Sequence, residues 1–160
     1  MRGDAQVIAR LNQALQEELT AINQYFVHAE MLHNWGYHRL GSYIRKQSID
    51  EMKHAEKLLE RVLFLEGTPV MQPMALTIGA DVRAQFRNDL DLELKAVVAY
   101  NDNIKVAMEA ADHASRDLFA SLLRDEEGHV DFLETQLQLI EQIGLDNYLA
   151  QQLGDLEERH

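Results

Sequence analysis

Apolar residues recur at three- and four-residue intervals along most of the chain, which is the spacing of one face of an α-helix. Leu, Ala, Glu, Gln and Arg, which favour helices, fill the positions around them. Gly144 is placed to end the last long helix. The pattern predicts an all-α protein with four long helices and a short C-terminal fifth helix, over residues 5–34, 38–66, 81–111, 113–143 and 146–153. We expect the polar end, residues 157–160, to fray.

Two connections decide how these helices are arranged. Residues 35–37 form a break so short that the first two helices must be antiparallel. Residues 67–80 contain both prolines, and fourteen extended residues reach about 46 Å, more than the roughly 40 Å length of a 27-residue helix. This connection can cross the whole bundle, so we expect the second and third helices to be parallel. The predicted fold is a single ferritin-like four-helix domain spanning residues 1–160.

Composition narrows the classes of function. The net charge is −12, from 27 acidic and 15 basic residues, which excludes a basic nucleic-acid binder and disfavours an anionic membrane surface. The N-terminal residues lack a signal-like apolar run, and no segment approaches the roughly 18–20 apolar residues of a membrane span. We therefore expect a cytoplasmic protein. It has no cysteine, so a metal would have to be bound by carboxylates, imidazoles or thioethers.

Each predicted long helix carries one acidic residue within its apolar stripe. As an unpaired buried ion, each would cost several kcal/mol, so these positions need an explanation. Other acids fall outside the stripes: Glu17 shares the polar side of its helix with Gln13, Thr20 and Gln24, and we expect this side to be solvated. The four acids within the stripes are Glu18, Glu51, Glu93 and Glu126.

The four glutamates are regularly spaced. Glu18 and Glu51 are 33 residues apart, and so are Glu93 and Glu126. The second glutamate of each pair begins a Glu-x-x-His motif, and the first is followed seven residues later by a tyrosine. A shift of 75 residues therefore superimposes the first set on the second, and the histidines and tyrosines concerned are His54, His129, Tyr25 and Tyr100.

This doubled pattern points to a pair of metal ions. Residues three apart share one face of a helix, so each Glu-x-x-His can approach one metal region. Four carboxylates neutralise two divalent ions, and mixed oxygen and nitrogen ligands suit iron or manganese. A single Glu-x-x-His is usually just part of a solvated face. Two copies at equal offsets, each preceded by a glutamate in an apolar stripe, favour the set found in di-iron and di-manganese carboxylate bundles.

Several segments resemble those of bacterioferritins: GDAQVIARLNQALQEELTAINQYFVHAEM, SIDEMKHAEKLLERVLFLEG, LDLELKA and SRDLFASLLRDEEGHVDFLETQLQLIEQIGLDNYL. The resemblance covers nearly the whole chain and is weakest at residues 67–80 and 100–112. It implies a cytoplasmic iron-storage and detoxification protein, a homo-oligomeric 24-mer built from dimers. Such a cage oxidises Fe(II) with O2 or H2O2 at a di-iron ferroxidase centre and stores the product as a ferric mineral.

The resemblance also implies roles for individual residues. One iron would be held by Glu18, Glu51 and His54, and the other by Glu93, Glu126 and His129, with Glu51 and Glu126 bridging the two. Tyr25 would contact these ligands, and Tyr100 is a second candidate for such a contact, although a plain core tyrosine is the favoured interpretation of Tyr100. We expect the remaining histidines to be solvated or already satisfied by hydrogen bonds: His28, His33, His38 and His113.

A second implied cofactor is a b-type haem bound through Met52 at an interface between two subunits. Met52 lies about 100° around the helix from Glu51, on a flank with Ile49 and Leu59. A thioether ligand raises the haem potential, which suits electrons arriving from a small electron-transfer protein to release iron. The other interpretation of Met52 is a methionine that packs against a neighbouring subunit.

One position departs from the family pattern. Many bacterioferritins carry a histidine where this chain has Lys46, paired with an acid equivalent to Asp50 in an iron site on the inner cage surface. Protonated lysine is a poor ligand, so such a site is in doubt here.

Other functions remain open from the sequence. A di-iron peroxidase or oxidase without mineral storage is the first alternative, although relatives of that kind usually carry a cysteine-rich module. A twelve-subunit mini-ferritin lacks the short fifth helix and builds its iron site between subunits. A haem-binding or structural cage would not oxidise iron. Co-assembly with a second ferritin subunit type is also possible.

Overall fold

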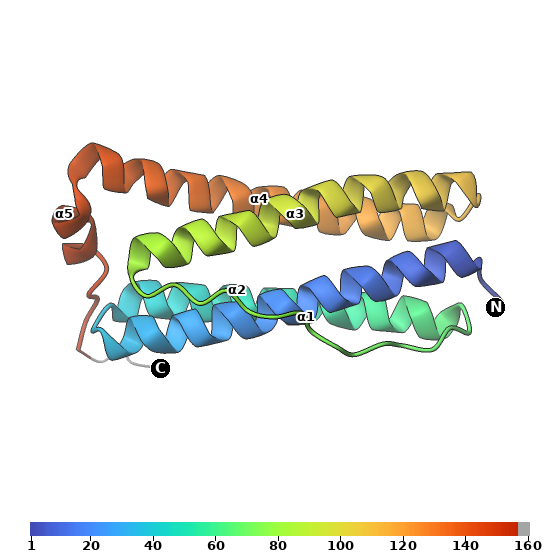
Figure 1. The fold of residues 1–160 in the computed structure, drawn as a ribbon, viewed down its shortest axis with the longest axis horizontal. Helices are drawn as coiled ribbons and strands as arrows, with labels where there is room; N and C mark the ends of the chain where they lie inside the picture. Colours follow the sequence, from blue (N-terminus) through green and yellow to red (C-terminus); the bar gives the residue numbers. More distant parts are fainter. Residues whose placement is uncertain (157–160) are drawn as a thin grey trace.

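The computed structural model describes residues 1–156, and the expected fraying of residues 157–160 lies outside them. The chain forms four long helices and one short helix (Figure 1), as predicted, and the described residues contain no strand. The helices are α1 Ala5–Asn34, α2 His38–Phe64, α3 Val82–Glu109, α4 His113–Ile143 and α5 Leu145–Ala150. None of the helices in this part of the chain contains an apolar stretch of the length that a membrane span requires.

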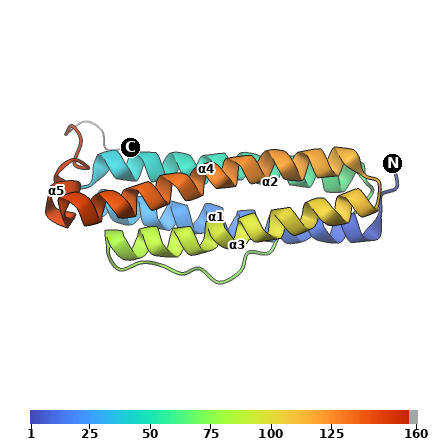
Figure 2. The same cartoon turned by 90° about the horizontal axis from the view of Figure 1, so that it is seen from above.

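The helices form two antiparallel pairs. α1 packs along α2 and α3 along α4, and the pairs meet mainly where α1 lies against α3. The segment between α2 and α3 runs back along α1 for most of the bundle's length, so α2 and α3 are parallel (Figures 1 and 2). The ferritin-like four-helix bundle with one long crossover is therefore confirmed.

Local backbone chemistry sets the helix ends. Three long helices begin at an aspartate whose side chain accepts a hydrogen bond from a free backbone N–H: Asp4, Asp81 and Asp112. α2 ends at Phe64 and α3 at Glu109, two residues earlier than predicted, because Glu66 and Ala111 adopt left-handed backbone with φ of 61° and 54°.

The short fifth helix also differs from its predicted range, 146–153. It starts one residue earlier, directly after Gly144, whose φ is 85°. It ends at Ala150 because the N–H groups of Gln151 and Gln152 bond to carbonyls three residues back, which makes a turn. The carbonyl of Gln152 then accepts a hydrogen bond from the backbone N–H of Arg39, 3.1 Å away, and this ties the end of the segment to α2.

Polar side chains of α1 hold the crossover in place. Backbone N–H groups of the crossover donate to the side chains of Asn12, Thr20, Gln24 and His28 over 2.8–3.1 Å. Thr20 and Gln24 are therefore only 2% exposed, so the prediction that this side of α1 is solvated was wrong. The crossover covers a polar face by satisfying its hydrogen bonds.

The apolar core is divided into two clusters along the bundle. One lies towards the N-terminal end of α1 and includes Leu11, Leu58 and Phe119. The other lies towards the opposite end and includes Phe86 and Ile140. On each long helix, one buried glutamate falls between the stretches that supply the two clusters. The buried polar residues therefore lie near the middle of the bundle, between the two apolar clusters.

Candidate metal centre

The six predicted ligand residues lie together near the middle of the bundle. α1 and α3 each supply one glutamate, and α2 and α4 each supply a glutamate and a histidine one turn apart. The four glutamates are at most 2% exposed. The apolar clusters on either side restrict access of bulk water along the bundle axis. The residues are Glu18, Glu93, Glu51 with His54, and Glu126 with His129.

These side chains form two overlapping groups that could each hold a metal ion. In each group, one ligand atom from every member lies within 4.8 Å of the others. Glu51 and Glu126 belong to both groups. The remaining members are Glu18 and His54 in one group and Glu93 and His129 in the other. The arrangement fits two metal positions that share two carboxylates, one from α2 and one from α4.

Both imidazoles turn their Nδ1 atoms towards the carboxylates. His54 Nδ1 is 3.0 Å from Glu126 Oε1 and 3.5 Å from Glu18 Oε2. His129 Nδ1 is 2.8 Å from Glu51 Oε1 and 3.3 Å from Glu126 Oε2. The Nδ1 lone pair of each neutral imidazole can therefore reach the space that the carboxylates surround.

Unsatisfied atoms provide a test of whether a metal fits here. Among the described residues, one buried carboxylate oxygen on each of the four glutamates lacks a partner in hydrogen-bond geometry, and so does Nδ1 of His129, although this atom lies 2.8 Å from Glu51 Oε1. Five such atoms would be costly in a purely structural core. Bound cations would satisfy all of them at once, so the donor set fits a pair of divalent ions.

Two tyrosines bind the outer sides of the glutamates. The Tyr25 hydroxyl donates to Glu93 Oε1, and the Tyr100 hydroxyl donates to Glu18 Oε1, both over 2.5 Å. Tyr100 is thus not the plain core tyrosine that was expected. Burial and then the neighbouring carboxylates raise the pKa of each hydroxyl well above its usual value, so both remain hydrogen-bond donors.

Asp125 supports one histidine from outside, a contact that the sequence analysis missed. Its Oδ2 lies 3.0 Å from His54 Nε2, the nitrogen that faces away from the carboxylates. Asp50 is its counterpart under the shift of 75 residues, and each precedes the glutamate of a Glu-x-x-His. That repetition was the available signal. Asp50 lies instead 3.9 Å from Lys53, so the two halves of the site differ here.

Burial and mutual repulsion control the protonation of the carboxylates. Burial, followed by repulsion from Glu18, raises the pKa of Glu51 to about 8. Burial and repulsion from Glu51 likewise raise the pKa of Glu126 to about 7. Burial also raises the pKa of Glu18, but hydrogen bonds with Glu51 and His54 outweigh it, so the net pKa is lowered. Without metal, protons partly neutralise the cluster.

Comparison with known proteins agrees with this geometry. A family model described as a ferritin-like domain matches residues 8–143. The bacterioferritin of Brucella melitensis is 46% identical over 149 residues, which cover 92% of each chain. The chain belongs to the bacterioferritin family.

Two further bacterioferritins are similar to this chain over nearly its whole length. The bacterioferritin of Streptomyces coelicolor is 44% identical over 151 residues, which cover 94% of this chain and 90% of that protein. Bacterioferritin BfrA of Mycobacterium tuberculosis is 43% identical over 152 residues, covering 94% and 96% respectively. The residues matched by the family model, 8–143, include the four buried glutamates.

The residues proposed to act outside the metal centre lie on the surface of α2. Met52 is 55% exposed, although the adjacent Glu51 is 1% exposed, because successive residues point in different directions around a helix. Ile49, on the same flank, is 37% exposed. Lys46 is also exposed, one turn before Asp50. Met52 is therefore accessible to a ligand or to another subunit.

Within residues 1–156, the four histidines outside the metal centre lie next to other polar groups or solvent. His28 is fully buried, with Nδ1 2.9 Å from Asp89 and Nε2 accepting from the backbone of Gly79. His33 and His38 stack with their Nδ1 atoms 3.0 Å apart. His113 is exposed and accepts from Arg116. These observations agree with the expectation for all four.

The metal-free protein should lose stability as the pH rises from about 6 to 9. Glu51, Glu126, His54 and His129 have folded pKa values above their ordinary ones, so the folded state binds more protons than the unfolded state in this range. For the histidines, the attraction of the neighbouring glutamates outweighs the effect of burial. We expect the free energy of unfolding to fall by roughly 1–3 kcal/mol.

Thermal denaturation at several pH values, with EDTA or with Zn(II), would measure this effect. Metal binding needs deprotonated ligands, so the stabilisation by Zn(II) should grow as the pH rises. A metal-free protein that becomes more stable between pH 6 and 9 would contradict the assigned protonation.

Proposed function

We propose that this chain oxidises Fe(II) at a di-iron centre and stores the ferric product. Its membership of the bacterioferritin family supports a role in iron storage. The observation that carries the proposal is the sharing of Glu51 and Glu126 between two ligand groups. Such sharing holds two iron ions close together, as a two-electron reaction requires.

The ligand assignment follows from these groups. Glu18 and His54 would bind one Fe(II), Glu93 and His129 the other, and Glu51 and Glu126 would bridge both. Two Fe(II) ions supply two electrons, which with two protons reduce O2 to H2O2 or H2O2 to two waters. Burial and mutual repulsion raise the pKa of both bridging carboxyls, so protons that they hold in the metal-free protein would be released as iron binds. Tyr25 and Tyr100 would hold Glu93 and Glu18 in position.

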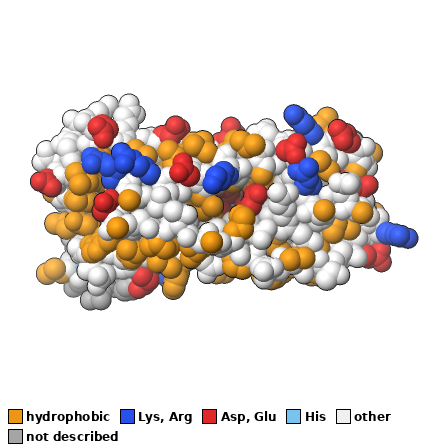
Figure 3. Space-filling view, in the orientation of Figure 1, with side chains coloured by type: hydrophobic (Ala, Val, Ile, Leu, Met, Phe, Trp, Pro, Cys, Tyr) orange, Lys and Arg blue, Asp and Glu red, His pale blue; other side chains and the backbone are white. Residues whose placement is uncertain are grey.

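Storage requires a closed assembly, and we propose a homo-oligomeric cage of 24 subunits. The crossover exposes four large apolar side chains, which is unusual for the surface of a monomer. Figure 3 shows hydrophobic side chains gathered on part of the face that carries the crossover. These residues would be buried between subunits: Val70, Met71, Met74 and Ile78.

We propose that residues 1–160 form one domain, that the cage works in the cytoplasm, and that a small electron-transfer protein supplies electrons for iron release. A second ferritin subunit type could join the same cage. The alternative is a di-iron peroxidase or oxidase without mineral storage.

Aerobic addition of excess Fe(II) followed by sizing distinguishes these two functions. Storage predicts a particle of about 440 kDa, for 24 chains of 18.4 kDa, that carries many irons per subunit. A small oligomer that retains two irons per chain would overturn storage and support the oxidase.

Met52 is the proposed haem ligand, and its replacement should remove haem binding. Leucine fills a similar volume but has no sulfur to coordinate iron. Met52→Leu is therefore expected to lose the haem absorption band after reconstitution, with little change in the rate of Fe(II) oxidation. Met108→Leu is a matched control, since Met108 is 54% exposed on α3. If the band persists in Met52→Leu, the haem is bound elsewhere.

A further inference from the structure

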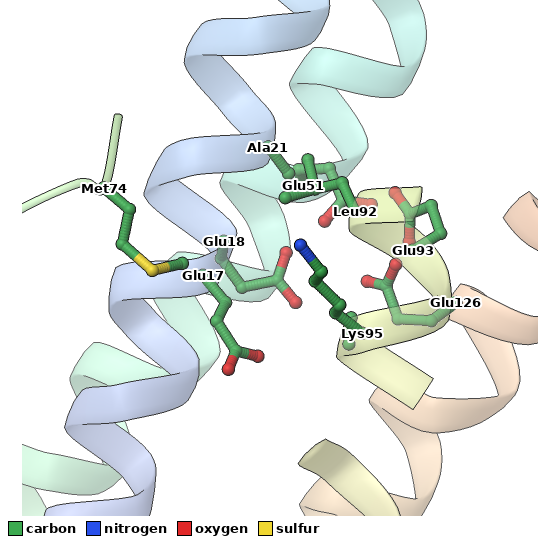
Figure 4. A pocket seen from close by; sticks show the side chains of 10 residues that line it. Glu17, Glu18, Ala21, Glu51, Met74, Leu92, Glu93, Lys95 and Glu126 are labelled. Atoms are coloured by element: carbon green, nitrogen blue, oxygen red, sulfur yellow. The ribbon is translucent and has the colours of Figure 1, made fainter. Parts of the chain in front are cut away.

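A cavity leads from the protein surface to the metal centre between α1 and α3. Its volume is about 180 Å³, and four of the proposed iron ligands line its inner part: Glu18, Glu51, Glu93 and Glu126. Two charged residues outside the ligand set also line it, Glu17 of α1 and Lys95 of α3 (Figure 4). Both therefore lie beside the route by which an ion could reach the ligands.

Glu17 has one unsatisfied side-chain carboxyl oxygen beside this cavity. Its side chain is half-buried, and Oε2 is shielded from water without a hydrogen-bond partner in residues 1–156. The side chain next to it, Glu18, is a proposed ligand. A cation bound by Glu17 would therefore lie in the same cavity as Glu18 and the other proposed ligands of the metal centre.

Lys95 brings a positive charge to the same cavity. Its side chain extends from α3 across the cavity towards Glu18 (Figure 4). Within the described part of the chain, no carboxylate oxygen lies within 4.0 Å of its ammonium group. The group is exposed and has no fixed partner, so it can move at little cost.

We propose that the ammonium group of Lys95 is a mobile counter-cation that repels cations entering the cavity. We also propose that Glu17 is the first carboxylate to bind an incoming divalent ion. In the empty site, the ammonium offsets part of the charge of the clustered carboxylates. An arriving divalent cation neutralises these carboxylates better and displaces the ammonium towards solvent. Lys95 thus slows the entrance of cations and Glu17 accelerates it. The inference rests on the proposed function only in taking the natural ion to be Fe(II).

Stopped-flow binding of Co(II) to the assembled, metal-free protein tests the inference without redox chemistry. Lys95→Gln should raise the association rate roughly three- to tenfold, and Glu17→Gln should lower it by a similar factor. Both effects should shrink as salt is added. The number of Co(II) ions bound per chain should stay unchanged, because the six ligands remain.

Control variants separate this role from a structural one. Lys105→Gln removes an exposed positive charge of α3 that does not line the cavity, and Glu56→Gln removes an exposed negative charge of α2 that does not line it either. Neither change should alter the association rate of Co(II). Lys95→Arg keeps the charge and should behave like the native protein. Equal association rates for native protein, Lys95→Gln and Glu17→Gln would overturn the inference. If Co(II) binding responds as expected but Fe(II) is not oxidised, the proposed function fails and the inference stands.

Discussion

Replacing Glu51 with glutamine is expected to abolish rapid Fe(II) oxidation while leaving the metal-free protein as stable as before, or more so. Glutamine has the same shape but cannot supply the charged oxygens that both metal positions share. We expect the fast oxidation rate to fall on the order of 100-fold or more. In the metal-free state, the same change removes a buried carboxyl whose pKa burial and repulsion raise to about 8. At pH 8 this should stabilise the fold by roughly 1–3 kcal/mol.

The experiment is decisive because the oxidation rate is expected to fall while the stability of the metal-free protein is expected to stay the same or rise. Stopped-flow absorbance gives the oxidation rate, and thermal denaturation with EDTA gives the stability. Glu56→Gln is the matched control, because Glu56 is exposed on the same helix, and neither quantity should change. A Glu51→Gln protein that oxidises Fe(II) at the native rate would show that Glu51 is not a bridging ligand.

The sequence predicted the fold well because its main features are local or follow from length. Helical periodicity placed the long helices, and the length of residues 67–80 gave the parallel arrangement of α2 and α3. The predicted helix boundaries were wrong by up to a few residues, because a residue in the left-handed backbone conformation, such as Glu66, ends a helix although the hydrophobic pattern continues. The prediction was also wrong for Thr20 and Gln24, which look solvated on an isolated helix and are covered only once the crossover folds over them.

The metal centre was predictable for a different reason. Burying four glutamates is so unfavourable that regular spacing alone indicates a compensating ligand. The contacts that surround the metal centre were harder to predict from the sequence, because they depend on the relative register of facing helices. Tyr100 reaches Glu18 across 82 residues of sequence, and Asp125 reaches His54 across 71. Periodicity within one helix carries no information about such pairs.

A polar network beside the centre gives the second large prediction: Asp89→Ala should destabilise the fold by about 3–5 kcal/mol. Asp89 Oδ1 lies 2.9 Å from both Gln24 Nε2 and His28 Nδ1, and all three side chains are at most 2% exposed. Its removal leaves two buried polar groups without their partner. The other polar atoms of the same two side chains, Gln24 Oε1 and His28 Nε2, accept hydrogen bonds from the backbone N–H groups of Thr77 and Gly79, so the crossover should loosen along with them.

Urea denaturation of the metal-free protein would measure this loss, and limited proteolysis would show whether residues 75–80 become the first cleavage site. Asp91→Ala is the control, since Asp91 is exposed on the same helix and surface changes of this kind usually stay within about 0.5 kcal/mol. A loss below about 1 kcal/mol for Asp89→Ala would mean that water replaces the carboxylate without cost. The expected larger loss would instead show that α1, α3 and the crossover share one buried network. That network would then hold α1 against α3, the two helices that carry Glu18 and Glu93, and so help to fix the spacing of the metal centre.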